Sequence, residues 1–512
     1  MMKFFKNNVL SIVVFITGAC VLVIEVVAIR ILSPYYGNTI FTVSSVIGVI
    51  LAALSLGYYV GGRFADGHPS LRCFFGIILI GGISVLFLQL LNFTFLPVLG
   101  YGLSITSGPL ISAVILFFLP AFLLGTLSPF AIKLQKLRLT TAGVGSVAGE
   151  VFFWSTFGSI FGSLIAGFVL IPKFGINQIV IAVGVLLILM GFAPLFWLGI
   201  KKKIVNRIVL ILLVIGVSLT FILLNEKKTG VLYSKDGVYE KITIYDEEYE
   251  GRQTRFLQQD RSASGAMFLD SDELVYDYTK YYVLYKIFKP DVKNALVIGG
   301  GAYSVPKAIL KDLPNTTVDV VEIEPSLFEL AEKYFNVTKT ERLQNYVEDG
   351  RRFLYDADAK YDLIFSDVYY SLFSIPAHFT TQEFFAITKD KLNQDGVFIA
   401  NIIGDLSPQR PSFIMSEIKT FLTVFPNSYF IALGSPEKIT SQNIIFVGYN
   451  SDKKLDFNDP KLEMSADPII RSLGKKNINL DRFDLSSHPI LTDDFSPVEY
   501  LTAKFLQRTF NR

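Results

Sequence analysis

The sequence predicts an α-helical multi-pass membrane bundle followed by an α/β domain with a small β-strand subdomain at its start. The chain has 512 residues, of which 51% are hydrophobic and only 18% charged, whereas an average soluble protein is about 25% charged. The deficit in charge lies almost wholly before residue 225. After that point strand-like and helix-like segments alternate, which is typical of a parallel sheet covered by helices.

We therefore divide the chain into residues 1–224, a bundle of about seven membrane helices, residues 229–284, a small β-strand subdomain ending in a helix, and residues 285–512, the α/β domain. A helix needs about 20 apolar residues to cross a bilayer. Runs of that kind are Val9–Leu32, Phe41–Gly62, Cys73–Asn92, Pro109–Lys133, Val151–Pro172, Ile179–Gly199 and Ile208–Leu224. The first run is too long, and is followed by too many others, to be a cleaved signal peptide.

Basic residues cluster in alternate connections between these runs. The clusters are Lys3 and Lys6; Arg63 and Arg72; Lys133, Lys136 and Arg138; and Lys201, Lys202, Lys203 and Arg207. The positive-inside rule then places the N-terminus in the cytoplasm of a protein of the cell membrane. Seven crossings would leave the α/β domain outside, although the ligand inferred below is a cytosolic metabolite. Either the count is off by one, with 93–108 as a possible extra segment, or the domain is extracytoplasmic; we favour a cytosolic domain.

The segment after the apolar runs is predicted to form short strands joined by hairpins. Residues 231–270 alternate apolar and polar side chains, as in Tyr239–Tyr245, which is typical of half-buried strands. The segment Leu274–Phe288 has apolar and aromatic residues at helical spacing, so we expect a helix there. From Asn294 onward, strands are predicted at 295–298, 318–321, 361–365 and 397–400, with helices between them.

A run of three glycines follows the first of these strands. Gly299, Gly300 and Gly301 stand between a strand and a helix, where glycine lets the backbone approach a ligand closely. Glu322 ends the second strand about 20 residues later, where an acidic side chain can accept from both hydroxyls of a ribose. A dinucleotide site would continue G-x-G-x-x-G, but its last glycine is replaced by Ser304. A nucleoside without phosphate, such as S-adenosylmethionine, therefore fits better, and the domain is expected to be Rossmann-like, of the methyltransferase type.

Two further strand ends offer ligand groups. Asp349 and Gly350 follow a further strand that lies between 318–321 and 361–365, where a carboxylate can accept from an adenine amino group, and Asp367 follows the strand at 361–365. In a parallel sheet these strand ends meet at the edge where ligands bind. The alternative for Glu322 and Asp349 is that each caps a helix, because acidic side chains favour helix N-termini.

Composition argues against several other kinds of partner. The net charge is +2 and no basic stripe is present, so a nucleic-acid partner is not expected. Cys20 and Cys73 lie in apolar runs with no further cysteine or histidine at ligand spacing, and the chain has three histidines in all. We therefore expect no metal site.

These motifs resemble those of the spermidine synthases, a family of polyamine aminopropyltransferases, over about residues 231–400. The matching segments are Leu296–Gly301, Val321–Pro325, Glu348–Leu354, Tyr361–Asp367, Asp272–Tyr276, Pro376–Ala377 and Phe384–Phe385. With the apolar first part and the closing Leu491–Glu499, the chain resembles the membrane-fused branch of that family. The resemblance implies decarboxylated S-adenosylmethionine as co-substrate, a polyamine or other amine as acceptor, Asp367 as the general base, and a possible homo-oligomer formed through the soluble domain.

The chain departs from the family pattern where that family binds its amines. Ala302 replaces the acid that holds the aminopropyl ammonium, Tyr370 replaces a second acid, and Asp277 and Tyr278 replace a histidine and a glutamate after Tyr276. From the resemblance, the candidate substrate-binding residues are therefore Tyr276, Asp277, Tyr370 and Asp494. The acids that can restore the lost charge are Asp277, Asp493, Asp494 and Glu499. Two alternatives stay open: a methyltransferase using S-adenosylmethionine itself, and a transporter whose soluble domain senses a nucleoside.

Overall fold

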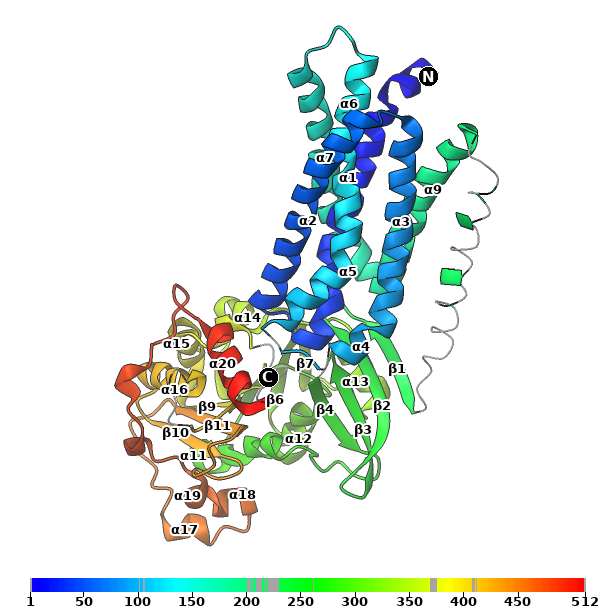
Figure 1. Cartoon of the computed structure of the whole chain (residues 1–512). Helices are drawn as coiled ribbons and strands as arrows, with labels where there is room; N and C mark the ends of the chain where they lie inside the picture. The colour runs from blue at the N-terminus through cyan, green and yellow to red at the C-terminus, as the bar shows by residue number, and fades with distance from the viewer. Residues whose placement is uncertain are drawn as a thin grey trace. The chain divides into compact units, whose positions relative to one another are not determined.

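The structure, a computed structural model, describes residues 2–100, 102–104, 106–199, 230–260, 262–368, 375–407, 410 and 412–510, together with a few positions between 203 and 218. It divides into two compact units, Met1–Thr229 and Gly230–Arg512 (Figure 1). Each unit has its own hydrophobic core.

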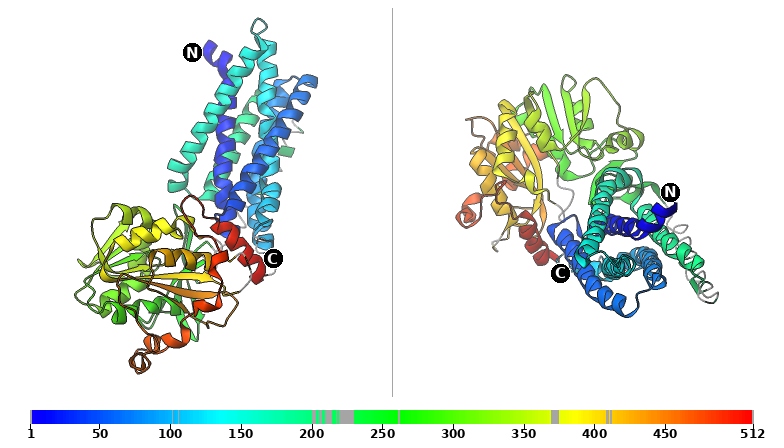
Figure 2. Two further views of the ribbon diagram at one scale, coloured as in Figure 1. Left: turned by 90° about the vertical axis from the view of Figure 1, so that its left-hand side faces the viewer. Right: turned by 90° about the horizontal axis from the view of Figure 1, so that it is seen from above.

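The first unit is a bundle of helices, seen end-on in the view from above in Figure 2. Its helices are α1 (Met2–Tyr36), α2 (Ile40–Gly67), α3 (Leu71–Thr94), α4 (Leu96–Leu99), α5 (Gly108–Gly125), α6 (Leu127–Arg138), α7 (Val144–Ile165), a π-helical turn (Ala166–Leu170), α8 (Ile171–Lys173) and α9 (Ile176–Trp197). Among the described residues, 6 helical stretches are long and apolar enough to cross a membrane. They coincide with the first six predicted runs, and the seventh, 208–224, falls mostly outside the described residues.

Small residues bring these helices into backbone contact. A Cβ added at Gly158 of α7 would lie 1.9 Å from the carbonyl oxygen of Phe15 in α1, and one at Gly162 would lie 2.3 Å from that of Ala19. A Cβ at Gly57 of α2 would likewise lie 2.4 Å from a carbonyl oxygen of α5. The pairs α1–α7 and α2–α5 therefore pack at glycines, which let two helix backbones approach closely.

The second unit begins with a 4-stranded antiparallel sheet in the order β1-β2-β3-β4. Its strands are β1 (Val231–Asp236), β2 (Lys241–Tyr249), β3 (Arg252–Gln259) and β4 (Ser262–Phe268). The helix expected over Leu274–Phe288 begins only at Asp277 and is mostly of another type: a 3-10 helix, Asp277–Leu284, is followed by one α-helical turn, α11 (Tyr285–Phe288). Four consecutive residues, 281–284, are buried, so the segment is enclosed on all sides and does not follow the single-stripe pattern of a surface helix.

A 7-stranded sheet follows in the order β10-β11-β9-β8-β5-β6-β7. Five parallel strands are β5 (Asn294–Ile298), β6 (Thr317–Glu322), β7 (Leu343–Val347), β8 (Tyr361–Ser366) and β9 (Leu392–Gly404), and two antiparallel ones are β10 (Ser428–Ala432) and β11 (Gln442–Tyr449). The helices are α12 (Ser304–Asp312), α13 (Leu327–Tyr334), α14 (Gly350–Asp356), α15 (Gln382–Asp390), α16 (Phe413–Val424), α17 (Pro460–Glu463), α18 (Pro468–Arg471), α19 (Leu473–Lys476) and α20 (Val498–Phe510).

Both faces of this sheet are covered. Successive residues of β5 belong to different cores: Ala295 and Val297 to one, Leu296 and Ile298 to the other. A strand that is buried on both faces reads as a continuous apolar run, which explains why β5 and β8 are so apolar. The predicted Rossmann-like α/β fold with a preceding β subdomain is confirmed.

The contact between α1 and α7 provides a test of bundle packing. We expect Gly158→Ala to lower the stability of the full-length protein in detergent by about 1–3 kcal/mol, because the added methyl group overlaps the Phe15 carbonyl and forces the helices apart. The measurement is thermal unfolding. Gly149→Ala is the matched control, since Gly149 is on the same helix and a Cβ there meets nothing within 4 Å. Equal melting temperatures for the two variants would contradict this packing.

Candidate functional site

Four groups predicted from the sequence meet at the carboxyl edge of the large sheet. Strands β8, β5, β6 and β7 are neighbours in that order, so Asp367, the glycine turn 299–301, Glu322 and Asp349 follow one another along this edge. Neighbouring strands are about 4.8 Å apart, so the row extends over roughly 14 Å. That length suits a ligand with several recognition groups in a line.

The glycine turn is enclosed from two sides. Gly299 has φ +90°, and a Cβ added to it would lie 2.3 Å from the carbonyl oxygen of Asp367. Gly301 has φ +51°, and a Cβ there would lie 2.7 Å from the carbonyl oxygen of Ser264 in β4. Residues with a side chain rarely adopt such backbone angles, so glycine is required here both by conformation and by space. The turn therefore lies directly between β4 and the loop after β8.

Glu322 holds this turn. Its side chain is 5% exposed, and one carboxylate oxygen accepts hydrogen bonds from the backbone N–H groups of Gly300 (2.8 Å) and Gly301 (3.3 Å). The other oxygen accepts from the N–H of Glu324 at 2.9 Å. Burial raises the pKa of Glu322, and the hydrogen bonds from these N–H groups oppose that rise. Glu322 thus organises the loops after β5 and β6, and its predicted contact with a ribose stays a prediction.

Asp349 does cap a helix. One oxygen of its carboxylate accepts from the backbone N–H groups of Arg351 (3.1 Å) and Arg352 (3.0 Å) at the start of α14. The other oxygen is 3.0 Å from Nε2 of His378. Burial opposes ionisation of this carboxyl, but the hydrogen bonds from His378 and the backbone leave the pKa of Asp349 below its usual value. The capping alternative is therefore correct for one oxygen, while the contact with an adenine amino group remains a prediction for the other.

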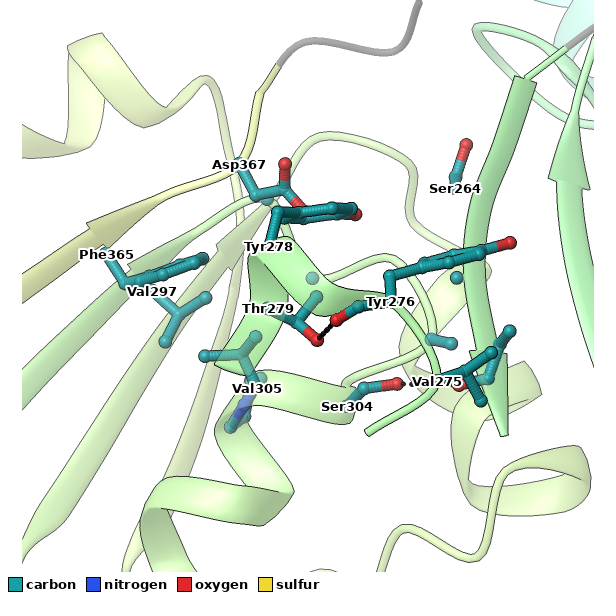
Figure 3. A pocket seen from close by; sticks show the side chains of 16 residues that line it. Ser264, Val275, Tyr276, Tyr278, Thr279, Val297, Ser304, Val305, Phe365 and Asp367 are labelled. Carbon is teal, nitrogen blue, oxygen red and sulfur yellow. Dashed lines mark hydrogen bonds between the residues drawn. The ribbon is translucent and has the colours of Figure 1, made fainter. Parts of the chain in front are cut away.

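Asp367 lies in a pocket between the glycine turn and β4 (Figure 3). The pocket is lined by Ser264, Gly265, Ala266, Val275, Tyr276, Tyr278, Thr279, Val297, Gly299, Gly300, Ala302, Ser304, Val305, Pro306, Phe365 and Asp367. The Asp367 carboxylate accepts a hydrogen bond from Nδ2 of Asn401 at 3.1 Å, and Oδ1 of Asn401 accepts one from Asn443 at 2.9 Å. Burial raises the pKa of Asp367, and the hydrogen bonds from Asn401 and Tyr278 partly offset the rise.

Two tyrosines from the segment before α11 stack in this pocket. The ring centroids of Tyr276 and Tyr278 are 5.9 Å apart and the rings are inclined by 13°. Burial, and then the charge of Asp367, raise the pKa of Tyr278 well above its usual value, so its hydroxyl remains a donor to Asp367. The hydroxyl oxygen of Tyr276 is buried without a hydrogen-bond partner among the described residues. A buried polar atom of this kind is usually satisfied by a water or a ligand.

Asp277 and Asp494, two other candidate substrate residues, are not among the residues that line this pocket. Asp277 is exposed and forms an ion pair with Lys280 at 2.9 Å, and Asp494 is exposed. Tyr370 lies outside the described residues. The closing segment is packed against the domain as expected, since Leu491 is fully buried.

The acids of the closing segment were expected near the amine end of the site. The described contacts of Asp493 are at the opposite end, where both of its oxygens bind Arg351 of α14, at 2.6 and 2.5 Å. Arg351 follows Asp349 by two residues, so this ion pair lies beside the outermost strand, β7. The expectation is wrong for Asp493, because a bidentate arginine on α14 attracts it.

Sequence reasoning missed Asn401, Asn443 and His378. Asn401 is 2% exposed in the middle of a buried apolar strand, Val397–Ile403. A single polar side chain in such a run is the one signal that pointed to it, because buried polar groups need partners. Among the described residues, no group of three or more His, Cys, Asp or Glu side chains is placed to hold a metal ion.

Comparison with known proteins gives one family. Residues 273–459 match the family model described as the spermine/spermidine synthase domain. The polyamine aminopropyltransferase of Vibrio vulnificus is 23% identical over 288 residues, 54% of this chain and 92% of that protein. Polyamine aminopropyltransferase 2 of Aquifex aeolicus is 23% identical over 511 residues, 93% of this chain and 96% of that protein.

Two further matches are a methyltransferase and a solved structure. The eEF1A lysine and N-terminal methyltransferase of Xenopus laevis is 29% identical over 199 residues, 37% of this chain and 27% of that protein. A solved structure of a probable spermidine synthase from Corynebacterium glutamicum has a TM-score of 0.42 at 19% identity, covering 52% of this chain and 98% of that one.

The role of Glu322 in the turn can be tested apart from any ligand. We expect Glu322→Gln to destabilise the turn by about 1–3 kcal/mol, because the amide places an N–H group where a carboxylate oxygen accepts backbone N–H groups. The measurement is hydrogen exchange of residues 299–304 and 322–326 in the full-length protein, which should become faster. Glu332→Gln, an exposed site in α13, is the control. Unchanged exchange in Glu322→Gln would show that the turn holds without this carboxylate.

Proposed function

Because residues 273–459 match the spermine/spermidine synthase domain, we propose that this chain is a membrane-bound transferase that moves the aminopropyl group of decarboxylated S-adenosylmethionine to an amine. The observation that carries this proposal is the Asp367 carboxylate, which lies in a pocket beside the glycine turn with its pKa raised by burial. The same sheet edge offers a row of groups suited to a nucleoside, on the far side of the turn.

The acceptor must lose a proton before it can react. An alkylammonium group has a pKa of about 10, like that of lysine, so it is charged near neutral pH. The Asp367 carboxylate accepts this proton, and its raised pKa makes it a stronger base than an ordinary aspartate. Tyr278 and Asn401 fix the direction of the carboxylate, and the stacked ring of Tyr276 places a further polar atom beside the acceptor nitrogen.

The sulfonium substrate supplies the electrophilic carbon. The lone pair of the amine forms a bond to this carbon as the carbon–sulfur bond breaks, and the electrons of that bond leave with methylthioadenosine. The enzyme orients the nucleoside by close approach to Gly299–Gly301, by the carboxylate of Glu322 at the ribose and by that of Asp349 at the adenine. Each of these carboxylates has lone pairs left after its hydrogen bonds within the protein.

Methyl transfer is the second candidate, and one observation favours it. Ala302, where the family has an acid for the aminopropyl ammonium, is 4% exposed and is packed against Gly265. An uncharged wall there suits S-adenosylmethionine, whose side chain ends in a carboxylate as well as an ammonium group. Incubation of the full-length protein with each donor and a panel of amines, with products read by mass, separates the two reactions. A product heavier by one methyl group would reject aminopropyl transfer.

For the membrane, we propose that the first unit spans the bilayer and that the second unit lies on the cytoplasmic side. The six described helices of sufficient length support a membrane location. The proposed side requires an even number of crossings in all, because only then does the chain return to the side of the N-terminus. The basic clusters favour a cytoplasmic N-terminus. Protease protection of the second unit in sealed, inside-out vesicles tests this side, because a cytoplasmic unit is cleaved there.

The role of Asp367 can be measured directly. We expect Asp367→Asn to lower kcat on the order of 10²–10⁴-fold, because an amide cannot accept the proton of the amine. Binding of methylthioadenosine, followed by calorimetry, should be unchanged, since Asp367 lies at the other end of the row from Asp349. The control is Asp494→Asn, which removes an exposed carboxylate. A loss of activity in the control that equals the loss in Asp367→Asn would restore the tail acids as candidates.

The hydrogen bond from Asn401 predicts a shift in pH dependence. This bond lowers the pKa of Asp367, so Asn401→Leu should raise that pKa and move the acidic limb of kcat/KM to higher pH. Asn443→Leu should shift the limb in the same direction by a smaller amount, because it acts through Asn401. Because burial raises the pKa of Asp367 in the folded protein, the free energy of unfolding should also fall as the pH rises from the ordinary pKa of an aspartate through the raised one. An unmoved acidic limb in Asn401→Leu would mean that another group is the base.

A further inference from the structure

We propose that Asp493, in the closing segment of the chain, is a positioning residue for the nucleoside. It acts through Arg351, which holds the turn 376–381 against Asp349 at the nucleobase end of the site. The inference rests on the proposed function and deepens it, because it assigns the closing segment to the binding of the nucleoside and not to that of the amine.

One guanidinium group joins three segments of the chain. Arg351 lies in α14, and its Nη1 donates hydrogen bonds to the carbonyl oxygen of His378 at 3.1 Å and to the hydroxyl oxygen of Thr381 at 3.3 Å. Nη1 and Nη2 also donate to the two carboxylate oxygens of Asp493, at 2.6 and 2.5 Å. A planar guanidinium group fits a carboxylate in this two-point way, so Asp493 fixes the plane of the group that holds the turn 376–381.

The closing segment is itself held in place. Thr381 donates a hydrogen bond from its hydroxyl group to Asp493 at 2.9 Å, and the backbone N–H of Asp493 donates to the carboxylate of Glu383 at 3.0 Å. The carbonyl oxygen of Leu491 accepts a hydrogen bond from the backbone N–H of Gln382 at 2.9 Å. These contacts all lie at the start of α15, so the position of Asp493 does not depend on its arginine partner alone.

The turn 376–381 contacts the nucleobase end at two points. Nε2 of His378 is 3.0 Å from the carboxylate oxygen of Asp349 that does not cap α14. Phe379 is 5% exposed, and a Cβ added at Gly350 would lie 3.4 Å from its ring. His378 is therefore held by its side chain at Asp349 and by its carbonyl oxygen at the guanidinium group. Loss of the second contact makes the direction of the Asp349 carboxylate less restricted.

These groups are separate from the reacting end of the site. The side chains of Arg351, His378 and Asp493 are not among the described residues that line the pocket shown in Figure 3. In the order of the strands, β5 and β6 lie between β8, which Asp367 follows, and β7, which precedes Asp349. A change at Asp493 should therefore weaken binding of the nucleoside and leave proton transfer from the amine unchanged.

The test is Asp493→Asn in the full-length protein, because asparagine keeps the shape of the side chain and removes its charge. Calorimetry should show the Kd of methylthioadenosine raised by about tenfold, the effect of losing one charge-assisted hydrogen bond. KM for decarboxylated S-adenosylmethionine should rise by a similar factor, while kcat at saturating nucleoside and KM for the amine stay unchanged. Asp493→Glu should recover part of the affinity, since it restores the carboxylate.

Glu437→Gln is the matched control. Glu437 also binds an arginine, Arg482, through both of its carboxylate oxygens. It lies in the loop between β10 and β11, and β10 is at the opposite edge of the sheet from β7. This variant loses the same kind of ion pair and should bind methylthioadenosine as the wild type does.

A double-mutant cycle asks whether Asp493 acts through Arg351. Arg351→Gln removes the guanidinium group, so adding Asp493→Asn to it should raise the Kd no further. Arg351→Lys keeps the charge but loses the two-point geometry, so it should weaken nucleoside binding as well. Additive effects of Asp493→Asn and Arg351→Gln would overturn the inference.

The outcomes separate this inference from the proposed function. Wild-type protein that binds no methylthioadenosine overturns both. Equal Kd values for the wild type and Asp493→Asn overturn the inference alone, as does a change confined to kcat or to the KM for the amine. Weaker nucleoside binding in Asp493→Asn, with kcat retained and Glu437→Gln unaffected, supports it.

Discussion

The hydrogen bonds between the Glu322 carboxylate and the backbone of Gly300, Gly301 and Glu324 are the constraint on which the site depends. They join the loops that follow β5 and β6, and so fix the glycine turn relative to the sheet. Only glycine fits at positions 299 and 301 of this turn, because the backbone of Asp367 lies against Gly299 and that of Ser264 lies against Gly301. One buried carboxylate thereby fixes the position of the glycine turn beside the pocket of Asp367.

The row along the sheet edge separates two kinds of recognition. At the outer end, Asp349, His378, Arg351 and Asp493 form a polar cluster with several ion pairs and hydrogen bonds, and the closing segment of the chain is anchored there. At the inner end, Asp367 is a single carboxylate among tyrosines and aliphatic side chains. The two ends of the row therefore differ strongly in polarity.

The helices of the bundle pack in a different way from the strands of the sheet. Its closest pairs, such as α1 with α7, meet at glycines where a Cβ would overlap a carbonyl oxygen. Close backbone packing at small residues is typical of helices that associate within a bilayer, which agrees with the membrane location proposed for this unit. The two units thus carry separate determinants of stability: small residues in the first, and apolar strands covered on both faces in the second.

The sequence by itself determined the apolar helices, the alternation of strands and helices up to residue 400, and the strand ends at which the candidate ligand groups stand, because these depend on periodicity and on residues close together in the chain. It also identified Gly299–Gly301, Glu322, Asp349 and Asp367 as one set, but it did not predict β10 and β11. Only the tertiary structure decided what each of them contacts. Asn401 and Asn443 are 34 and 76 positions beyond Asp367 and reach it because β9 lies next to β8, and β11 next to β9. The pairing of Asp493 with Arg351, across 142 positions, likewise depends on how distant segments pack, which local pattern does not encode.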